Sequence, residues 1–454
     1  MMFDRVVQGR VVTPAEVIPN GYVAIAGERI TAIGQGEPPP AAVVQDFGDW
    51  LIVPGGIDAQ VHAGSYWGLP GLEPTTRAAA CGGITTAVDM PFDHPDPLNT
   101  MERVMAKIEA VERLAFCDVA LYGTVAPGGD PAVMTDMAAA GLCAFKISVC
   151  ESHPVRFPRI PADQQWAMLQ KAAALGLPLG IHNEDQEIVR AATTRVRATE
   201  QPSLLAHDRC RPEAAERAAT ALFLELAAEA GAHGHIVHIS TPSGFDLLDQ
   251  YRRAGFPATG EICVHYLTFD PAVENERLGA LIKVNPPLRP GGTELLWEQI
   301  RLGRVDAISS DHSTMSLTNK EGGTFYEAGP GVPGIESLLP AFYTGLEMRG
   351  FDAPRALAAH LSEKPAKLFG LWPRKGAIAL GADADLVVLE PGRFPYDSRH
   401  AHDDVNWSPY DGMVFTVRVA ATLVRGTSVW DGTDVLVAPG FGRFVRRLAP
   451  EAGA

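Results

Sequence analysis

Residues 51–62 read LIVPGGIDAQVH and mark the place where the pattern of the chain changes. From Ile57 to Ser310, short apolar segments typical of buried strands alternate with segments of helical period that are rich in Ala, Leu and Glu. Repeated strand-then-helix units imply parallel strands joined by right-handed crossovers. About eight such units fit into this stretch, which is the number that closes a (β/α)8 barrel. We therefore predict an α/β fold with a (β/α)8 TIM-like barrel over residues 54–374, and a doubly wound open sheet is the alternative.

Both flanks of the barrel region are built differently. Residues 1–53 contain β-branched runs separated by turn residues such as Asn20-Gly21. Residues 375–454 return to strands and turns, as in GAIALGADADLVVLEP and FTVRVAATLVRGTSVWDG. Two β segments that flank a barrel can pair in space. We therefore expect residues 1–53 and 375–454 to form one small accessory β domain built from both termini, with a tail at the end of the second segment.

The composition limits the classes of partner. The chain has 454 residues, of which 46% are hydrophobic and 20% charged, so it can bury a large core. Its net charge of −16 repels nucleic-acid phosphates and anionic lipids. The sequence has no apolar run of membrane-spanning length, and its start, MMFDRVVQGRVV, lacks the apolar segment of a signal peptide. We expect a cytoplasmic protein without a nucleic-acid or membrane partner, whose six cysteines are reduced core thiols.

Polar residues that close the apolar segments are the candidates for chemistry, because catalytic side chains in such barrels lie at the C-terminal ends of the strands. They are Gln60 and His62 in IDAQVHAG, Lys146 in CAFKISV, His182 in PLGIHNED, His238 in HIVHIS and Asp311 in VDAISSDHS. Gln60 and His62 are two residues apart and therefore share one face of a strand. Three imidazoles and a carboxylate at one barrel mouth suit zinc, cobalt or manganese.

Each of these residues also has a purely structural interpretation. A single histidine in an apolar strand is more often a hydrogen-bonded core residue than a metal ligand. Lys146 is harder to explain, since a buried ammonium is costly and cannot ligate a cation. Taken alone, it is best explained as a snorkelling or ion-paired lysine. The joint placement of the six residues is what favours a metal site.

The order of the motifs resembles one known family, the cyclic amidohydrolases, which comprise allantoinase, hydantoinase, dihydropyrimidinase and dihydroorotase. The resemblance covers nearly the whole chain and rests on VPGGIDAQVHAG, TTRAAACGGITTAVDMP, FKISV, IHNED, VHIST, ICVHYLTFD, VNPPLR, SSDHST, GVPGIESLLP, KPAKLFGL and KGAIALGADADLVVLEP. It implies a metal-dependent barrel enzyme that hydrolyses a small cyclic amide or ureide. It also implies that Lys146 carries carbon dioxide as N6-carboxylysine, so that the lysine becomes an anion able to bridge two metal ions.

The resemblance implies a role for each of the other strand-end residues. His182 and His238 would bind the second metal ion, whereas His62 and Asp311 would belong to the first. Asp311 would also be the general base that takes a proton from the attacking water and hands it to the departing ring nitrogen. By analogy with the family, the ions would be zinc, with cobalt or manganese as alternatives, and they would lower the pKa of the attacking water.

Gln60 departs from the family pattern, in which a histidine stands at this position. A neutral amide oxygen is a weaker zinc ligand than an imidazole, so the first ion would bind loosely, be a harder ion, or be absent. Gln60 is either a direct ligand or a polar residue that supports the ligands, and the sequence favours neither. Whether one or two ions bind therefore stays open.

The loop sequences favour some of the rings that the family opens over others. Dihydroorotase would require an arginine shortly after the metal-binding pair, and the run HAGSYWGLPG has none; Asp93 would also repel a substrate carboxylate. Asn285 in VNPPLR, by contrast, resembles the dihydroorotase version of that segment. VNWSPYDGMVFTVRVAATLVRG and VAPGFGRFV resemble allantoinase. We favour the conversion of allantoin to allantoate, with a hydantoinase, dihydropyrimidinase or cyclic imide hydrolase as the close alternative.

Loop residues near the barrel mouth are candidates for substrate binding. Tyr66 with Trp67, Asn285, and the backbone amides around Gly331 and Gly334 are the positions that the resemblance favours, although loop aromatics often pack against their own loop. His265 and His312 either support the ligands or are structural, and Glu184 and Asp185 are either supporting or surface residues.

A different class of function is a barrel that has lost catalysis and serves as an assembly scaffold, as some relatives of dihydropyrimidinase do. Gln60 is the feature that favours it. A scaffold has no physical need to keep Lys146, His182, His238 and Asp311 at one mouth, and we therefore favour the enzyme. The resemblance also implies a homo-oligomer, either a homodimer or a homotetramer.

Overall fold

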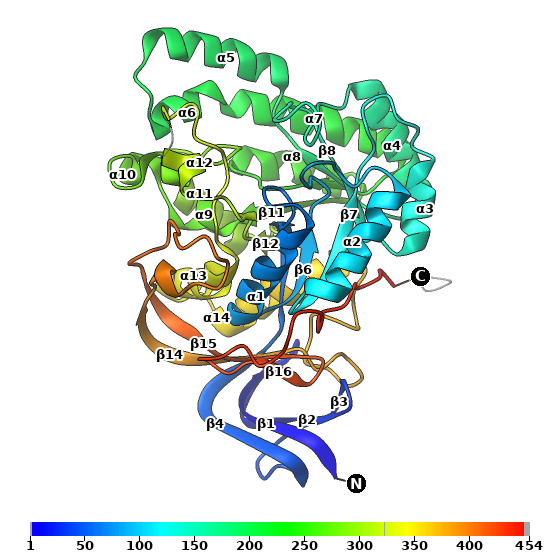
Figure 1. Cartoon of the computed structure of the whole chain (residues 1–454), viewed down its shortest axis with the longest axis vertical. Coiled ribbons are helices and arrows are strands. Elements are labelled where there is room, and N and C mark those ends of the chain that lie inside the picture. The colour runs from blue at the N-terminus through cyan, green and yellow to red at the C-terminus, as the bar shows by residue number, and fades with distance from the viewer. Residues whose placement is uncertain (1, 322, 449–454) are drawn as a thin grey trace.

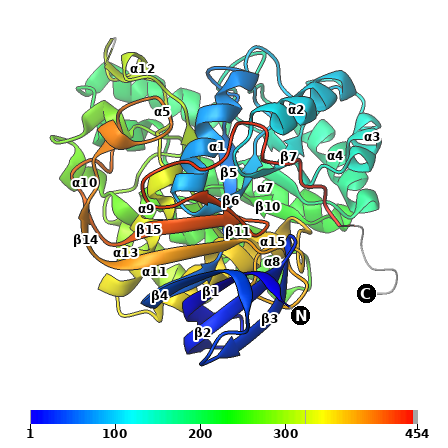
Figure 2. The ribbon, with the colours of Figure 1, turned by 60° about the horizontal axis from the view of Figure 1, so that its bottom comes forward.

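A computed structural model describes residues 2–321 and 323–448 of the chain (Figure 1). It consists of a barrel wrapped by helices and a second sheet that lies below it, where the N-terminal segment also lies. Figure 2 shows this second sheet from below, with the strands of both chain ends side by side. The two layers match the predicted barrel with an accessory β domain.

The barrel sheet is parallel throughout, and the described residues give it nine strands in the order β12-β11-β10-β9-β8-β7-β6-β5-β13. These strands are β5 (Gly56–His62), β6 (Ile84–Asp89), β7 (Asp118–Gly123), β8 (Ala144–Ser148), β9 (Leu179–His182), β10 (Gly234–Ile236), β11 (Ala258–Cys263), β12 (Ala307–Ser309) and β13 (His312–Ser313). Their residues are almost all buried, as expected for strands covered on both faces.

The sheet closes on itself through its last two strands. β12 pairs with β11, and after only Ser310 and Asp311 the chain continues as β13, which pairs with β5. β12 and β13 thus act as one interrupted eighth strand. The barrel prediction is confirmed, and the open doubly wound sheet is wrong because an open sheet would leave β5 and β12 as separate edges.

Helices follow most of the strands and cover the outside of the barrel (Figure 1). In the described part of the chain they are α1 (Leu72–Cys81), α2 (Met101–Leu114), α3 (Val133–Ala140), α4 (Ala162–Leu175), α5 (Gln186–Thr199), α6 (Leu204–Cys210), α7 (Glu213–Ala230), α8 (Pro242–Arg253), α9 (Val264–Thr268), α10 (Pro271–Glu274), α11 (Gly292–Arg301), α12 (Thr318–Glu321), α13 (Ile335–Met348), α14 (Ala353–Ala358) and α15 (Lys364–Leu368). Gly141, Gly176 and Gly231 end α3, α4 and α7 in the left-handed conformation that glycine adopts without strain.

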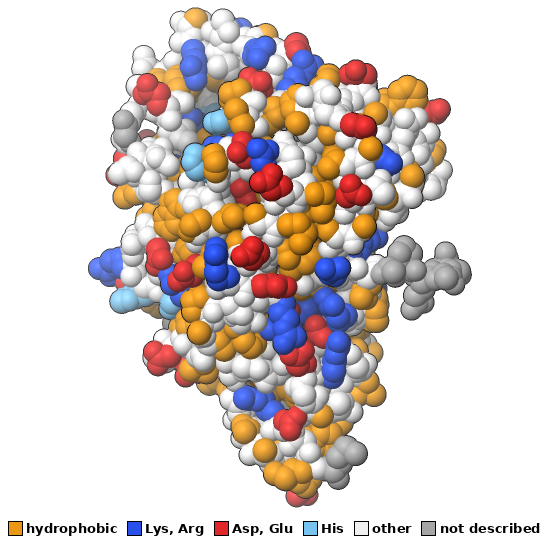
Figure 3. Space-filling view, turned by 45° about the vertical axis from the view of Figure 1, so that its right-hand side comes forward, with side chains coloured by type: hydrophobic (Ala, Val, Ile, Leu, Met, Phe, Trp, Pro, Cys, Tyr) orange, Lys and Arg blue, Asp and Glu red, His pale blue; other side chains and the backbone are white. Residues whose placement is uncertain are grey.

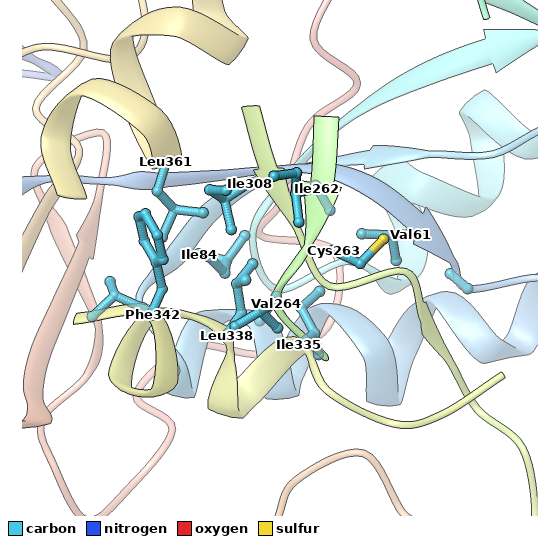
Figure 4. Packing of buried hydrophobic residues seen from close by; sticks show 14 of the residues in the cluster. Val61, Ile84, Ile262, Cys263, Val264, Ile308, Ile335, Leu338, Phe342 and Leu361 are labelled. Carbon is cyan, nitrogen blue, oxygen red and sulfur yellow. The ribbon is translucent and has the colours of Figure 1, made fainter. Parts of the chain in front are cut away.

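The core lies between the barrel strands and the helices packed on them. Figure 4 shows Ile84 and Ile308 from strands facing Leu338 and Phe342 of α13. All four side chains are fully buried. Truncating one of them, such as Phe342, to alanine would cost about 3–5 kcal/mol of folding free energy. This packing fixes the strand ends on which the polar residues sit.

The second sheet has seven strands in the described residues, in the order β16-β15-β14-β4-β1-β2-β3. They are β1 (Phe3–Val12), β2 (Val17–Ala26), β3 (Arg29–Gln35), β4 (Ala41–Pro54), β14 (Leu386–Pro395), β15 (Val414–Val424) and β16 (Thr427–Trp430). β14 pairs antiparallel with β4, so the two ends of the chain meet at this contact. We retain residues 1–53, 54–374 and 375–454 as proposed domain boundaries.

A buried ionic cluster links the second sheet to the barrel. Lys375 Nζ lies 2.6 Å from Asp118 of β7 and 2.7 Å from Asp385, which directly precedes β14. It also lies 3.0 Å from Asp383, and Arg425 reaches Asp118 as well. These groups are nearly inaccessible to solvent. Breaking such a cluster leaves an uncompensated buried charge, so it should hold the two sheets in a fixed relation.

The surface carries acidic and basic side chains in mixed order, as Figure 3 shows for one face. In the described part of the chain, every helix is too short or too polar to cross a bilayer. All six cysteines are buried and free of disulfide bonds.

Candidate active site

A pocket opens at the C-terminal ends of the barrel strands. Its wall contains all six strand-end residues predicted from the sequence, namely Gln60, His62, Lys146, His182, His238 and Asp311. The rest of the wall comes from loops that follow the strands and consists of Ser65, Tyr66, Phe92, Ser152, His153, Arg156, Phe157, Asn285, Ser313, Pro330 and Gly331. The barrel thus brings together residues that lie up to 251 positions apart in the chain.

His182 and His238 face each other at the end of β9 and just beyond β10. His182 Nδ1 lies 2.9 Å from His238 Nε2. The other nitrogen of His182 is bonded to Glu184 at 2.9 Å, and Arg211 holds Glu184 in turn at 2.8 and 2.6 Å. Since Glu184 fixes the proton on His182 Nε2, Nδ1 presents its lone pair to the pocket. Burial lowers the pKa of both histidines, which keeps them in the neutral form that binds metals.

Gln60, His62 and Asp311 form a second group of contacting residues in the pocket wall. Gln60 Nε2 donates to Asp311 Oδ1 at 2.7 Å, and His62 Nε2 lies 3.3 Å from the same oxygen. Gln60 Oε1 is buried and has no hydrogen-bond partner among the described residues. Burial raises the pKa of Asp311, but His62, His238 and Lys146 outweigh it, so the pKa lies well below its ordinary value. Asp311 is therefore an anion at neutral pH.

Backbone strain marks two of these positions. His238 has a φ of 41° and Asp311 a φ of 50°, in the left-handed region that residues with a Cβ seldom adopt. Such a conformation costs roughly 1–2 kcal/mol per residue. Both residues lie two positions beyond the end of a buried strand, and their side chains line the pocket.

Lys146 belongs to the same pocket wall and is fully buried in β8. Its Nζ has no hydrogen-bond partner in the described part of the chain and stands 5.7 and 5.9 Å from the ring centres of Phe92 and Phe157. Burial lowers the pKa of the amine to about 8, although Asp311 opposes this. The snorkelling or ion-paired interpretation of Lys146 is therefore wrong, because its amine neither reaches solvent nor pairs within 4 Å with a carboxylate of the described residues.

The donor set can be compared with what a metal ion needs. In residues 2–321 and 323–448, no three His, Cys, Asp or Glu side chains group closely enough to form a metal site by themselves. The pairs His182–His238 and His62–Asp311 each offer two donors, and an unmodified lysine offers none. A carbamate on Lys146 Nζ would supply the missing oxygen donors, and it would also give the orphaned amine a reason to be buried. The residues fit a divalent ion on this condition.

Comparison with known proteins decides the family. The family model described as "Amidohydrolase family" matches residues 51–429. The chain belongs to the amidohydrolase family.

Several relatives of known name agree with this assignment over more than nine-tenths of the amidohydrolase chain. It is 36% identical to an allantoinase of Rubrobacter xylanophilus over 98% of both chains, and 32% identical to an L-hydantoinase of Paenarthrobacter aurescens over 99% of this chain and 100% of the relative. It is also 34% identical to a dihydroorotase of Halobacterium salinarum over 91% of this chain and 94% of the relative. Among solved structures, L-hydantoinase (dihydropyrimidinase) from Arthrobacter aurescens superposes with a TM-score of 0.93 at 32% identity, covering 98% of this chain and 100% of that one.

The loop candidates of the amidohydrolase occupy different positions. Tyr66 and Asn285 line the pocket, whereas Trp67 is exposed and lies outside it. Tyr66 donates its hydroxyl to Pro330 O, and Asn285 Oδ1 lies 3.0 Å from His207 Nε2. The amide of Gly331 donates to Lys283 O at 3.0 Å.

The backbone amide of the second glycine, Gly334, is also hydrogen-bonded within the protein. Its amide donates to His312 Nδ1 at 3.1 Å. His312 thus holds the start of α13, although it directly follows Asp311 in the chain. A substrate role for the backbone amides of Gly331 and Gly334 would have to compete with these bonds.

The acidic residues near the site make different contacts. Glu184 supports His182, as described above, and Asp185 caps α5 by accepting from Ile188 N. Asp93 is buried and lies 2.8 Å from Lys107 Nζ of α2. Lys107 is shared with Asp89, which lies 2.7 Å from the same Nζ, and Asp93 itself lies outside the pocket wall, so its expected repulsion of a substrate carboxylate stays a prediction.

The sequence interpretation missed Arg156 and Phe157, which lie in the loop after β8. Phe157 packs its ring 3.8 Å from that of Phe92 and 5.6 Å from that of His182, measured between ring centres. The signal was the run ESHPVRFPR, residues 151–159, where two arginines and an aromatic residue follow the strand that carries Lys146. Substrate loops vary in conformation, so this run alone could not have placed the side chains.

Proposed function

We propose that this amidohydrolase hydrolyses the ring amide of a small cyclic ureide, and that allantoin, opened to allantoate, is its substrate. One observation carries the proposal. The amine of Lys146, which has no hydrogen-bond partner among the described residues, shares one pocket wall with two neutral imidazoles and the Asp311 carboxylate. The names of the similar allantoinases and of the L-hydantoinase support a cyclic amide as substrate. The hydantoinase or dihydropyrimidinase activity is the second candidate, supported by the TM-score of 0.93 to an L-hydantoinase.

We propose that Lys146, carboxylated on Nζ, holds a divalent ion together with His182 and His238. Zinc suits these nitrogen and oxygen donors, and cobalt or manganese would be tolerated. When bound, the ion would supply Lewis-acid activation of water and of the amide carbonyl. The 2.9 Å bond between Glu184 and His182 would keep the ligand ring in one orientation.

A second ion beside His62 and Asp311 would meet a different environment. Gln60 stands where the family has a metal-binding histidine, but it points its amide nitrogen, which is a hydrogen-bond donor, at Asp311. The Asp311 carboxylate is therefore already hydrogen-bonded on the side where a second ion would bind. This contact supports a single ion per chain in place of two. Gln60 would then serve as a hydrogen-bond donor that positions Asp311.

Asp311 is the group that would move the proton. It is ionised, largely shielded from solvent just beyond the strand end, and held on Oδ1 by Gln60 and His62. It would accept a proton from the attacking water and deliver it to the ring nitrogen when the C–N bond breaks. Phe92 and Phe157 would give the flat ring an apolar wall and keep bulk water out of the pocket.

The test is ring opening by protein that has been stripped of metal and then reloaded. The apoprotein should be inactive, and zinc, cobalt or manganese with bicarbonate should restore turnover of allantoin above that of hydantoin, dihydrouracil and dihydroorotate. No turnover of any of the four rings after reloading would overturn the proposal and favour the scaffold alternative. Turnover of hydantoin or dihydrouracil alone would keep the cyclic amidohydrolase and reject allantoin.

A homodimer or homotetramer and a cytoplasmic location stay predictions. They would be checked by light scattering and by fractionation of the source cells.

A further inference from the structure

Arg156 occupies a defined place in the pocket wall, although it belongs to a loop. His153 Nδ1 accepts the backbone N–H groups of Val155 and Arg156 at 3.2 and 3.1 Å, and Phe157 N donates back to His153 O at 2.9 Å. These bonds close a tight turn at residues 153–157. Arg156 is therefore placed by a turn with its own hydrogen bonds, next to Phe157 and the wall that carries His182.

The guanidinium of Arg156 contacts the loop that follows His62. It donates to Ser65 O and lies 6.0 Å from the ring centre of Tyr66. Ser65 Oγ in turn lies 3.0 Å from His62 Nδ1. One intervening residue, Ser65, thus separates the charged group from His62, which contacts the proposed general base Asp311. A substrate ring at that site would have its substituents within range of Arg156.

Arg156 has no carboxylate partner among the described residues, which distinguishes it from the arginines that support the barrel. Arg211 pairs with Glu184, and Arg289 pairs with both Asp208 and Glu216. The single carboxylate in the pocket wall is Asp311, and Gln60 and His62 already hold it. A guanidinium has five N–H donors arranged for planar acceptors, and one hydrogen bond to Ser65 O leaves most of them free.

We propose that Arg156 is the specificity residue of this pocket and binds a planar acceptor group, a carboxylate or a ureido carbonyl, on the substituent of the ring substrate. This inference rests on the proposed function, because it assumes that the ligand is the substrate. Binding of the ring to the pocket can nevertheless be measured without turnover. Phe92 and Phe157 would contact the ring, while Arg156 would select the substituent. An apolar substituent would leave the guanidinium desolvated without a new partner, and would therefore be disfavoured.

The experiment compares three 5-substituted hydantoins on zinc-loaded protein: hydantoin-5-acetate, allantoin with its ureido group, and 5-isopropylhydantoin. Binding is measured by calorimetry and turnover by kcat/KM, for the wild type, Arg156→Met and Arg156→Lys. The matched control is Arg159→Met in the same loop, because Arg159 lies outside the pocket wall and pairs with Glu187 at 3.2 Å. Thermal unfolding of each variant shows that it is folded.

We expect Arg156→Met to weaken binding and lower kcat/KM for the acetate or the ureido compound by roughly 10- to 100-fold, the range for loss of a charge-assisted bond. The effect on 5-isopropylhydantoin should be small, and Arg159→Met should behave like the wild type. The substituent that responds more strongly, acetate or ureido, identifies the natural acceptor group. Arg156→Lys should retain more of the acetate binding than of the ureido binding, since a point charge replaces the planar fork.

An equal loss for all three compounds, or no loss for any, would overturn the inference. So would wild-type protein that binds the isopropyl compound as tightly as the other two. If the polar compounds bind through Arg156 but no ring is opened, the proposed function fails while this inference stands.

Discussion

Gln60 Nε2 donates to Asp311 Oδ1 at 2.7 Å, and this bond joins the first strand of the barrel to the break in its last strand. The same break lets β13 pair with β5 and close the barrel. The residue that departs from the family pattern therefore contacts the proposed general base directly. Replacing Gln60 should change both the metal content and the position of Asp311.

The first prediction concerns Gln60→His, which restores an imidazole beside His62. The new lone pair should create a second site, so the metal content should rise from roughly one ion per chain to roughly two. Elemental analysis after dialysis against metal-free buffer measures this directly. Gln60→Ala is the control and should stay near one ion. An unchanged content in Gln60→His would show that position 60 lies outside the reach of the ion.

The second prediction concerns Lys146→Ala, which removes the proposed carbamate. Metal content should fall, and kcat/KM should drop by at least about 100-fold because an oxygen donor is lost. Short carboxylic acids such as formate, acetate and propionate should restore part of both, since they can occupy the vacated space as a substitute donor. Chloride at equal ionic strength is the control. Full activity in Lys146→Ala without added acid would contradict the role of the lysine.

The third prediction tests the ionic cluster under the barrel. Lys375→Met should leave Asp118, Asp383 and Asp385 without their shared cation and lower the free energy of unfolding by about 3–5 kcal/mol. Denaturant unfolding measures this. Lys367→Met is the control, because Lys367 is half exposed, and its contacts are a salt bridge to Glu363 and a position 4.8 Å from the Trp372 ring centre. Its loss should stay below about 1 kcal/mol. Equal stability of the two variants would show that the neighbouring arginines, Arg425 at Asp118 and Arg29 at Asp383, balance the aspartates without Lys375.

The fourth prediction is a pH dependence away from the active site. Burial, assisted by Glu336, raises the pKa of Asp403 to about 7. The folded state therefore binds this proton more tightly than the unfolded chain does, and the stabilising effect is complete below the ordinary pKa near 3.8 and disappears as the pH rises through 7. Asp403→Asn keeps the acceptor for Val405 N but cannot ionise. Its Tm should exceed that of the wild type by more at pH 8 than at pH 5.

The control for this prediction is Asp431→Asn. Asp431 also accepts backbone N–H groups, from Thr433 and Asp434, but it is exposed. Its difference from the wild type should not change between the two pH values. A constant difference for Asp403→Asn as well would mean that Asp403 is ionised in the folded protein at both.

The barrel could be predicted from the sequence because strands buried on both faces are mostly apolar, without the strict alternation of a half-exposed strand, as in Ile84–Asp89 and Ala144–Ser148. The strand-end residues could be predicted for a related reason. A lysine or histidine within such a strand has no solvent to reach, so Lys146 and His182 stand out from their surroundings. These contacts follow from the barrel itself.

Contacts made by loops and helices could not be predicted in the same way. The pairing of Asp93 with Lys107 joins a loop to α2, and the turn at His153 that presents Arg156 depends on a side-chain acceptor with no periodic pattern. The amide of Gly334 is bound by His312 across 22 residues. Such contacts depend on how loops fold over the barrel, and local sequence does not determine that.

The most direct test of the account is a crystal structure at high resolution, grown with zinc and bicarbonate, with anomalous diffraction recorded at the zinc edge. We predict a planar extension of the density beyond Lys146 Nζ and an anomalous peak beside His182 Nδ1 and His238 Nε2. An unmodified amine at Lys146, with the two imidazoles hydrogen-bonded to each other and no ion near them, would contradict the proposed metal-dependent hydrolase.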